Sequence, residues 1–404
     1  MKIRRTIPPT AAPISLTDLL HGLSGMMNRK SILKLETEIR DYFGAKHVFF
    51  VSSGKAALFL ILSGLRSLTG KKRVIIPAYT CFSVPSAIRM AGLEIVLCDI
   101  RPDSLDFDAT ELEGLIDDDT LCIIPTHLFG IPSDVENLHT ICRNRRIFIV
   151  EDVAQGMGST HGPQKLGVGG DVAFFSLGRG KNITCGDGGI IITSADDVAD
   201  SIRNHYSNVG RVPGGEYIRN ILEIIFLMIF IHPALYWFPS QLPFLKLGET
   251  RYHHDFPVRK LTGFQAGLLN DWRRKLERYN GRRSRNGGYY RRHLNRYNNL
   301  SKVSDQCQYL RFPICVKDKD AKDTLLKAGN HLGISPMYPC SANRIEEIKE
   351  LFGNTPYPRA ERLAESLVAL PTHILLKDKD IKAIVEAVGK VPNPTPESQG
   401  LLFS

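Results

Sequence analysis

Residues 172–189 read Val-Ala-Phe-Phe-Ser-Leu-Gly-Arg-Gly-Lys-Asn-Ile-Thr-Cys-Gly-Asp-Gly-Gly, and this stretch decides the fold. Its first four residues are an apolar, strand-like run, and residues 189–193 form another such run directly after it. Between the two runs lie Ser176, Lys181 and a glycine-rich segment that suits a tight loop. A lysine placed past the end of a strand can form a Schiff base with a carbonyl compound, so Lys181 is the first candidate catalytic residue.

A second motif lies upstream, where Glu151-Asp152-Val153-Ala154-Gln155 follows the apolar run 147–150. Pyridoxal phosphate chemistry needs a lysine and an acid opposite the ring nitrogen of the cofactor, which Lys181 and Asp152 would supply. Phosphate is bound by N–H groups at a helix start together with short hydroxyls. The turn Ser52-Ser53-Gly54-Lys55 and the hydroxyl of Ser176 are candidates for that role. The residues therefore predict pyridoxal 5'-phosphate as the cofactor.

Short β-branched runs alternate with helix-compatible stretches from residue 46 to 195, which predicts an α/β fold with a mostly parallel central sheet. The runs are 47–51, 73–76, 94–97, 122–124, 147–150, 172–175 and 189–193. Ligands bind at the carboxyl ends of such strands, where residues 52–54, Asp152 and Ser176 fall. A long polar helix over 261–297, a strand near 310–316 and helices at 319–331, 344–352 and 377–389 predict a smaller α+β domain.

The predicted organisation is an N-terminal arm (1–30), a large cofactor-binding domain (31–260), a small C-terminal domain (261–392) and a flexible tail (393–404). Composition also predicts disorder over residues 1–14. The large domain carries an apolar insertion at about 213–255, in which residues 221–238 are apolar except for Glu223 and His232. A transmembrane span is not expected here, because Pro233 interrupts the run and a span would place the two halves of the protein on opposite sides of the membrane. A membrane-surface or partner-binding hairpin is slightly favoured over an internally packed insertion.

The chain of 404 residues has a formal net charge of +10, which favours an anionic partner such as a nucleoside diphosphate or an acidic membrane. Nucleic acid is the least favoured anionic partner and is not predicted, because neither zinc-finger spacing nor an RNA-binding signature is present. The basic run 273–292 is interpreted as a solvated helix face. Eight cysteines without a CxxC pair favour a reduced, cytoplasmic setting, and no metal site is predicted. Prolines follow Lys2, Arg4 and Arg5, so no secretory signal is expected.

Further motifs extend along most of the chain. The first is the segment 31–44, which is compatible with a helix. The remaining motifs are Ile76-Pro77-Ala78-Tyr79-Thr80, Thr126-His127-Leu128-Phe129-Gly130-Ile131-Pro132, Tyr357-Pro358-Arg359-Ala360-Glu361 and Leu370-Pro371-Thr372-His373. Together with the segments 53–58, 151–155 and 176–189, they resemble the DegT/DnrJ/StrS family of nucleotide-sugar aminotransferases, which have the aspartate-aminotransferase fold (fold type I).

The resemblance implies a role for each matching residue. Lys181 would form the internal aldimine and shuttle a proton, Asp152 would keep the ring nitrogen protonated, and Gln155 would bind the ring hydroxyl. Ser176 and the Gly54–Lys55 turn would bind the phosphate. The resemblance also implies a homodimer with shared active sites, in which Lys260 reaches the cofactor phosphate of the partner subunit.

Three positions depart from the family pattern. Lys55 replaces a usual Thr or Ser, and Cys81 occupies the place of the aromatic that stacks on the ring, with Phe82 as a possible substitute. The family's Asn-x-Arg-Met stretch becomes Val258-Arg259-Lys260-Leu261, so the asparagine is lost. Dehydrating relatives carry histidine in place of the lysine, and Lys181 argues against that chemistry.

We therefore predict an aminotransferase that moves an amino group from an amino acid, glutamate by resemblance, to a nucleotide-linked keto sugar. Its product would serve polysaccharide, glycan or secondary-metabolite synthesis, in the cytoplasm or at the inner face of the membrane through residues 221–238. The alternatives are another fold-type-I pyridoxal phosphate enzyme, such as a lyase or a non-nucleotide aminotransferase, and a catalytically silent scaffold that binds a membrane or partner. The sugar, ring position, stereochemistry and nucleotide are not specified by the sequence.

Overall fold

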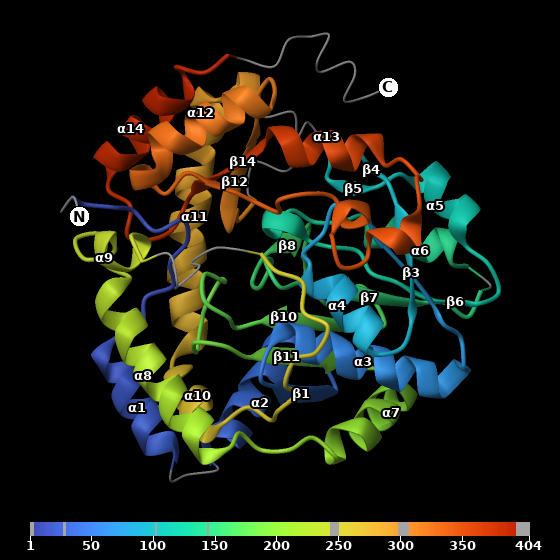
Figure 1. Ribbon diagram of the computed structural model, residues 1–404. Helices are drawn as coiled ribbons and strands as arrows, with labels where there is room; N and C mark the ends of the chain where they lie inside the picture. Colours follow the sequence, from blue (N-terminus) through green and yellow to red (C-terminus); the bar gives the residue numbers. More distant parts are fainter. Residues whose placement is uncertain are drawn as a thin grey trace.

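The computed structural model describes residues 4–26, 30–101, 103–143, 145–242, 250–297 and 307–392. Figure 1 shows a central sheet with helices around it and a smaller group of helices and strands above it, which the long helix α11 (Trp272–His293) joins to the lower part of the molecule. The predicted tail 393–404 lies outside the described residues.

Seven strands form the central sheet in the order β1-β11-β10-β7-β6-β2-β3. Their bounds are β1 His47–Val51, β2 Arg73–Pro77, β3 Glu94–Cys98, β6 Thr120–Ile123, β7 Phe148–Asp152, β10 Val172–Ser176 and β11 Gly189–Thr193. Only β11 runs antiparallel to its neighbours, β1 and β10, and the other pairs are parallel. The predicted strands and the mostly parallel α/β sheet are therefore confirmed.

Side chains alternate between the two faces of this sheet, and each face has its own core. Phe49 and Phe174 belong to a cluster with α3 (Gly54–Thr69), α4 (Ser83–Met90) and α7 (Asp196–Ser207), whereas Phe50 and Phe175 belong to a second cluster. The second cluster includes α2 (Lys30–Phe43), α10 (Gly263–Leu268) and the first half of α11. A third cluster, with α5 (Ala109–Leu115) and α6 (Val135–Ile141), covers the strands β2, β3, β6 and β7. Burial on both faces explains the continuous apolar strands.

Shorter elements complete the chain. They are α1 Leu16–Met26, the hairpins β4 Ile100–Arg101 with β5 Asp106–Phe107 and β8 Thr160–His161 with β9 Gln164–Lys165, and the 3-10 turns η1 Leu128–Gly130 and η3 Asn295–Tyr297. The smaller sheet has the order β12-β14-β13, with β12 Arg311–Cys315, β13 Ser335–Pro336 and β14 Leu367–Pro371. Around it lie α12 Lys319–Gly329, η4 Asn330–Leu332, α13 Pro358–Ser366 and α14 Asp378–Val388. The division at residue 260 remains a prediction.

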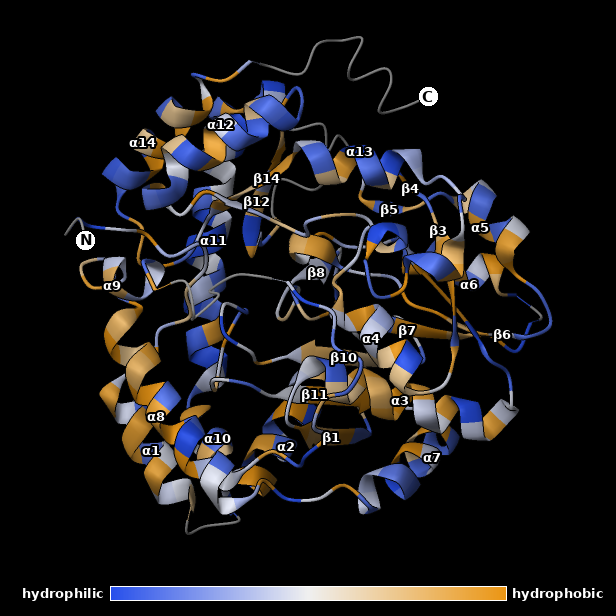
Figure 2. Cartoon of the chain, viewed as in Figure 1, coloured by the Kyte–Doolittle hydropathy of each residue, from blue (hydrophilic) through white to orange (hydrophobic). Residues whose placement is uncertain are grey.

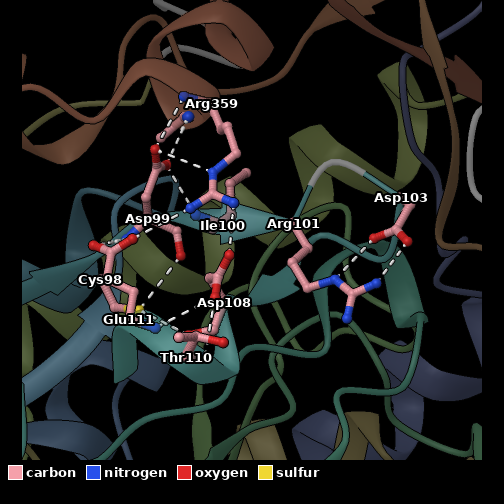
Figure 3. Close-up of polar contacts among 10 residues, drawn as sticks. Cys98, Asp99, Ile100, Arg101, Asp103, Asp108, Thr110, Glu111 and Arg359 are labelled. Atoms are coloured by element: carbon pink, nitrogen blue, oxygen red, sulfur yellow. Dashed lines mark hydrogen bonds and ion pairs between the residues drawn. The ribbon is translucent and has the colours of Figure 1, made fainter. Parts of the chain in front are cut away.

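Arg359 ties this smaller unit to the central sheet (Figure 3). Its guanidinium contacts three carboxylates that follow β3, with Nη1 2.6 Å from Asp108, Nη2 3.3 Å from Glu111 and Nε 3.5 Å from Asp99. Asp99 also accepts the backbone N–H groups of Arg359 and Ala360 at the start of α13. A carboxylate at a helix N-terminus satisfies N–H groups that otherwise lack a partner. The sequence motif 357–361, which contains Arg359, therefore has a structural role.

Three predicted segments differ from the structure. The helix over 261–297 is broken between α10 and α11, because Asp271 adopts a left-handed backbone (φ 59°). The helix at 344–352 is instead two 3-10 turns, η5 Ala342–Arg344 and η6 Lys349–Phe352. Residues 4–14, expected to be disordered, pack against the protein: Ile7 is 2% exposed and its N–H donates to the carbonyl of His331. A few buried apolar side chains outweigh the polar composition of this arm.

The apolar insertion forms α8 (Gly214–Phe230), a turn at Pro233 and the short α9 (Trp237–Ser240). Figure 2 shows α8 as a largely hydrophobic helix at the edge of the molecule. Ile224 is its buried anchor, at 3% exposure, whereas Ile218 and Leu222 remain more than 60% exposed. The insertion is thus neither fully packed nor fully detached. Among the described residues, no helix is long and apolar enough to cross a membrane.

Candidate active site

A cavity of about 720 Å³ opens at the carboxyl ends of β1, β7 and β10, and it gathers most of the predicted site residues. They are Gly54, Lys55, Asp152, Gln155, Ser176 and Lys181. Because parallel strands end at one edge of a sheet, residues about 100 positions apart in the sequence meet here. Lys260 is the exception, since it does not line this cavity.

One end of the cavity is built to approach an anion closely. Ser53 caps α3 by accepting the N–H of Ala56 at 3.2 Å. The two residues between them, Gly54 and Lys55, begin the helix and line the cavity. Helix geometry leaves such first-turn N–H groups without an intrahelical partner. A Cβ on Gly54 would lie 3.0 Å from the Cβ of Ser176, so glycine lets the helix start sit beside that serine. These features form a cradle of N–H and hydroxyl groups of the kind that binds phosphate in proteins.

Lys181 is held in the loop after β10 by its backbone. Its N–H donates to the carbonyl of Gly178 at 3.3 Å, and its own carbonyl accepts from Nη2 of Arg283 at 3.2 Å. Burial lowers the pKa of the Lys181 ammonium, while the nearby Cys81 and Asp152 oppose this shift. A lysine with a lowered pKa spends more time as the neutral amine, which is the nucleophilic form.

Asp152, at the end of β7, and Gln155 form the floor of the cavity. Burial raises the pKa of Asp152, although the N–H of Ala154, which donates to it at 2.9 Å, and the charge of Lys181 oppose the shift. The amide of Gln155 is already oriented, because its Oε1 accepts from the N–H of Phe129 and its Nε2 donates to the hydroxyl of Tyr338 at 3.0 Å. A buried carboxylate in this position favours a cationic partner above it.

Arg283 is the main support beneath the lysine, and it is 1% exposed. Its guanidinium donates to the carbonyls of Ala11, Lys181 and Asn182 and to the side chain of Asn280. Burial lowers the pKa of Arg283 to about 10. The group is therefore a positioning residue that joins the N-terminal arm, the lysine loop and α11. This corrects the interpretation of the basic run as a solvated face, which holds for exposed neighbours such as Arg292.

Glu151 stabilises the opposite side of the floor. Its carboxylate pairs with Nε2 of His127 at 2.8 Å and accepts the N–H groups of Gly167, Gly169 and Gly170. Burial alone would raise the pKa of Glu151, but the His127 contact and these N–H groups hold it below its usual range. The side chains of His127 and Glu151 thus fix the backbone around the cavity without lining it.

The structure places the residues that depart from the family pattern both inside and outside the cavity. Cys81 lines the cavity, whereas Phe82 is 6% exposed within the core and does not line it. Lys55 lines the cavity with its Nζ 4.8 Å from the ring centre of Phe256, and burial lowers its pKa. The Nζ of Lys260 lies 4.8 Å from the ring centre of Tyr206, outside the cavity.

The insertion supplies a wall that sequence reasoning did not anticipate. A polar stripe of α8 faces the cavity, consisting of Glu216, Arg219, Asn220 and Glu223. Ile224 on the same helix packs so closely on the loop after Lys181 that a Cβ at Gly186 would lie 2.4 Å from its Cδ1. Because Gly186 has a φ of +92°, a side chain there would be strained as well as crowded. The apolar insertion therefore belongs to the site.

Tyr338 and Asp187 are further cavity residues. Tyr338 is 183 positions from Gln155, so no local pattern could have found it. Asp187 lies in the glycine-rich segment between Lys181 and β11, it lines the cavity, and the surrounding protein raises the pKa of its carboxyl to about 6. That glycine-rich segment was the available signal for Asp187.

Several solved structures share this α/β architecture with its mostly parallel central sheet. PseC of Helicobacter pylori, an aminotransferase involved in the biosynthesis of pseudoaminic acid, has a TM-score of 0.76 at 19% identity, covering 95% of this chain and 98% of that chain. The E. coli GDP-4-keto-6-deoxy-D-mannose-3-dehydratase with bound hydrated PLP has a TM-score of 0.74 at 18% identity, covering 96% and 100%. These likenesses show the fold alone.

The chain belongs to the DegT/DnrJ/EryC1/StrS aminotransferase family, whose model matches residues 16–389. The GDP-perosamine synthase of Caulobacter vibrioides is 35% identical over 172 residues, which are 43% of this chain and 46% of that protein. The GDP-perosamine synthase of Vibrio cholerae is 29% identical over 199 residues, or 49% and 54% of the two chains. The chain therefore matches about half the length of these curated relatives.

Proposed function

We propose that this protein is a pyridoxal-phosphate-dependent aminotransferase in which Lys181 is the catalytic lysine. The observation that carries the proposal is the meeting of Lys181, Asp152 and the Gly54–Ser176 cradle in one cavity. Family membership supports the same activity. A scaffold without activity would not need a half-buried lysine beside a buried acid.

The residues present fit the cofactor. The N–H groups at the start of α3 and the Ser176 hydroxyl would hold its phosphate, because a Cβ at Gly54 would close the space that they share. Asp152 would face the ring nitrogen and Gln155 the ring hydroxyl. When bound, pyridoxal phosphate supplies an electron sink for the negative charge that develops on the reacting carbon.

The protein's own part in the reaction is to hold and move a proton. The low pKa of Lys181 keeps its Nζ available to take a proton from the substrate carbon and to return it to another position. Asp152 would keep a proton at the ring nitrogen of the bound cofactor through its negative charge. The Arg283 contacts with the carbonyls of Lys181 and Asn182 keep the lysine backbone in place while its side chain moves. A lysine at this position favours transamination over dehydration.

For the substrates, we propose glutamate as amino donor and a keto sugar on a nucleoside diphosphate as acceptor. The named GDP-perosamine synthases support the nucleotide-linked acceptor. Lys55, Arg179 and Arg219 in the cavity supply cations for acidic substrates. The sugar product would enter polysaccharide, glycan or secondary-metabolite synthesis.

We further propose a cytoplasmic homodimer in which Lys260 faces the cofactor phosphate of the second subunit. Its side chain lies outside the cavity of its own subunit, as such a role requires. Eight free cysteines are in keeping with a reducing compartment. Peripheral contact of the exposed side of α8 with the inner membrane face is part of the same proposal.

Absorption spectroscopy tests the proposed activity. The purified protein with pyridoxal phosphate is expected to show a visible band that glutamate converts to the spectrum of the amine form of the cofactor. Lys181→Ala should lose the band, whereas Lys379→Ala, which removes an exposed lysine on α14, should keep it. A band that persists in Lys181→Ala would refute the assignment of the lysine. A wild-type band that does not respond to amino donors would refute the aminotransferase.

A further inference from the structure

A second hollow of about 370 Å³ adjoins the catalytic cavity along α8, and we call it the α8 groove. Its wall is apolar over most of its length, with Leu222, Phe226, Phe230 and Ile231 among the lining side chains. Tyr236, after the Pro233 turn, also lines the groove. The catalytic reaction described above does not use this groove.

The α8 groove is continuous with the catalytic cavity. Arg179, Arg219 and Glu223 line both hollows, so these three residues mark their junction. Along α8 the wall changes from polar at Glu216 to apolar at Phe230. The rise of an α-helix places Arg219 and Phe230 roughly 16 Å apart. A single elongated ligand could therefore have its polar end in the catalytic cavity and its apolar end in the groove.

Charge at the junction favours an anionic group there. Nη2 of Arg179 lies 2.5 Å from Oε2 of Glu223, and Nε of Arg219 lies 3.8 Å from Oε1 of the same carboxylate. Among the three residues that line both hollows, two guanidinium groups thus share one carboxylate. Guanidinium groups match phosphate oxygens in geometry as well as in charge.

We propose that the α8 groove binds the hydrocarbon chain of a lipid phosphate to which the keto sugar is attached. The phosphate would lie at Arg179 and Arg219, and the sugar would reach Lys181. The inference rests on the proposed aminotransferase function and extends its acceptors from nucleotide-linked sugars to lipid-linked ones. A nucleoside would leave the apolar wall uncovered, whereas a hydrocarbon chain would bury Leu222, which is 62% exposed, and Phe226, which is 37% exposed.

Calorimetric titration with two probes tests the groove. Farnesyl diphosphate and isopentenyl diphosphate share a headgroup and differ in chain length. Farnesyl diphosphate, below the concentration at which it forms micelles, is expected to bind at least about tenfold more tightly, because burial of even a few methylene groups has this effect. Equal affinities for the two probes would overturn the proposal. The spectral response to glutamate, measured on the same wild-type protein, tests the aminotransferase separately.

Variants measure separately how the hydrocarbon end and the phosphate end of the ligand contribute to binding. Phe226→Gln should weaken binding of farnesyl diphosphate about tenfold and leave isopentenyl diphosphate unchanged, since Phe226 lies roughly 10 Å along α8 from Arg219, beyond the reach of the five-carbon chain. Arg219→Gln should weaken both probes by a similar factor. Ile229→Gln on the same helix is the matched control, because Ile229 is also partly exposed, at 44%, but does not line the groove, and it should alter neither affinity.

Two other occupants give different results, and each would overturn the proposal. If the apolar side of α8 serves only to bind a membrane surface and the groove holds no hydrocarbon chain, the protein should sediment with anionic phospholipid vesicles while the two soluble probes bind equally. If the groove is an interface between copies of this chain, Leu222→Glu should lower the mass measured by light scattering, again without an effect of chain length.

Discussion

The floor of the catalytic cavity and the α8 insertion form two walls of one site, but they are stabilised in opposite ways. On the floor, polar groups are buried and paired: Glu151 accepts three loop N–H groups and Arg283 binds three carbonyls. On α8, one apolar side chain, Ile224, is buried and most of the helix remains partly open. The floor is thus fixed by many specific contacts and the insertion by few. We infer that the floor determines the chemistry and the insertion determines what can enter.

The largest expected effect is on the floor. Asp152→Asn keeps the size of the side chain but removes the negative charge that would hold a proton on the ring nitrogen. Turnover is expected to fall on the order of 10²–10³-fold, as for the loss of a preorganised charge elsewhere. Steady-state rates with glutamate and a keto-sugar nucleotide measure it, with the exposed Asp378→Asn as the control. A loss below about threefold would remove Asp152 from the catalytic set.

Arg283→Met should reveal how far the lysine loop depends on its support. Removing the guanidinium leaves the buried carbonyls of Ala11, Lys181 and Asn182 without their donor. The free energy of unfolding is expected to fall by about 3 kcal/mol, and the affinity for pyridoxal phosphate should fall with it. Arg292→Met, on the exposed part of the same helix, should change stability by less than about 0.5 kcal/mol. Equal effects in denaturant unfolding would contradict the positioning role.

The insertion can be probed with two isoleucines of one helix. Ile224→Ala removes its buried anchor and should lower the free energy of unfolding by about 2–4 kcal/mol, or detach α8 locally. Ile218→Ala, at a position that is 61% exposed, should cost less than about 0.5 kcal/mol. Hydrogen exchange along α8, together with unfolding curves, distinguishes global from local loss. Similar behaviour of the two variants would mean that α8 is not anchored as the structure shows.

The contact between the two walls should give the smallest of these effects. Gly186→Ala and Gly162→Ala both place a side chain on a backbone with positive φ, at a cost of about 1 kcal/mol. Only the Cβ at Gly186 meets another atom, the Cδ1 of Ile224, whereas nothing lies within 4 Å at Gly162. Gly186→Ala should therefore cost about 1–2 kcal/mol more than Gly162→Ala in unfolding experiments. No difference would show that the walls are not in close contact.

This contrast also explains what the sequence could predict. Strand runs and the motifs around Lys181, Asp152 and Gly54 are local patterns, so the sheet and most of the site residues followed from them. The role of Arg283 did not, because a basic run is the same in sequence whether a given arginine faces solvent or the core. Tyr338 reaches the site from the smaller sheet unit, and the partial burial of α8 depends on Gly186. Such long-range contacts leave no periodic signal.

Identification of the lysine that binds the cofactor tests the central claim most directly. Two lysines, Lys55 and Lys181, line the catalytic cavity, and both have a pKa lowered by burial. Treating the protein with pyridoxal phosphate and borohydride, followed by peptide mass spectrometry, marks the lysine that forms the bond. We expect the modification on Lys181 alone. Modification of Lys55 instead, or of surface lysines without preference, would contradict the proposed site.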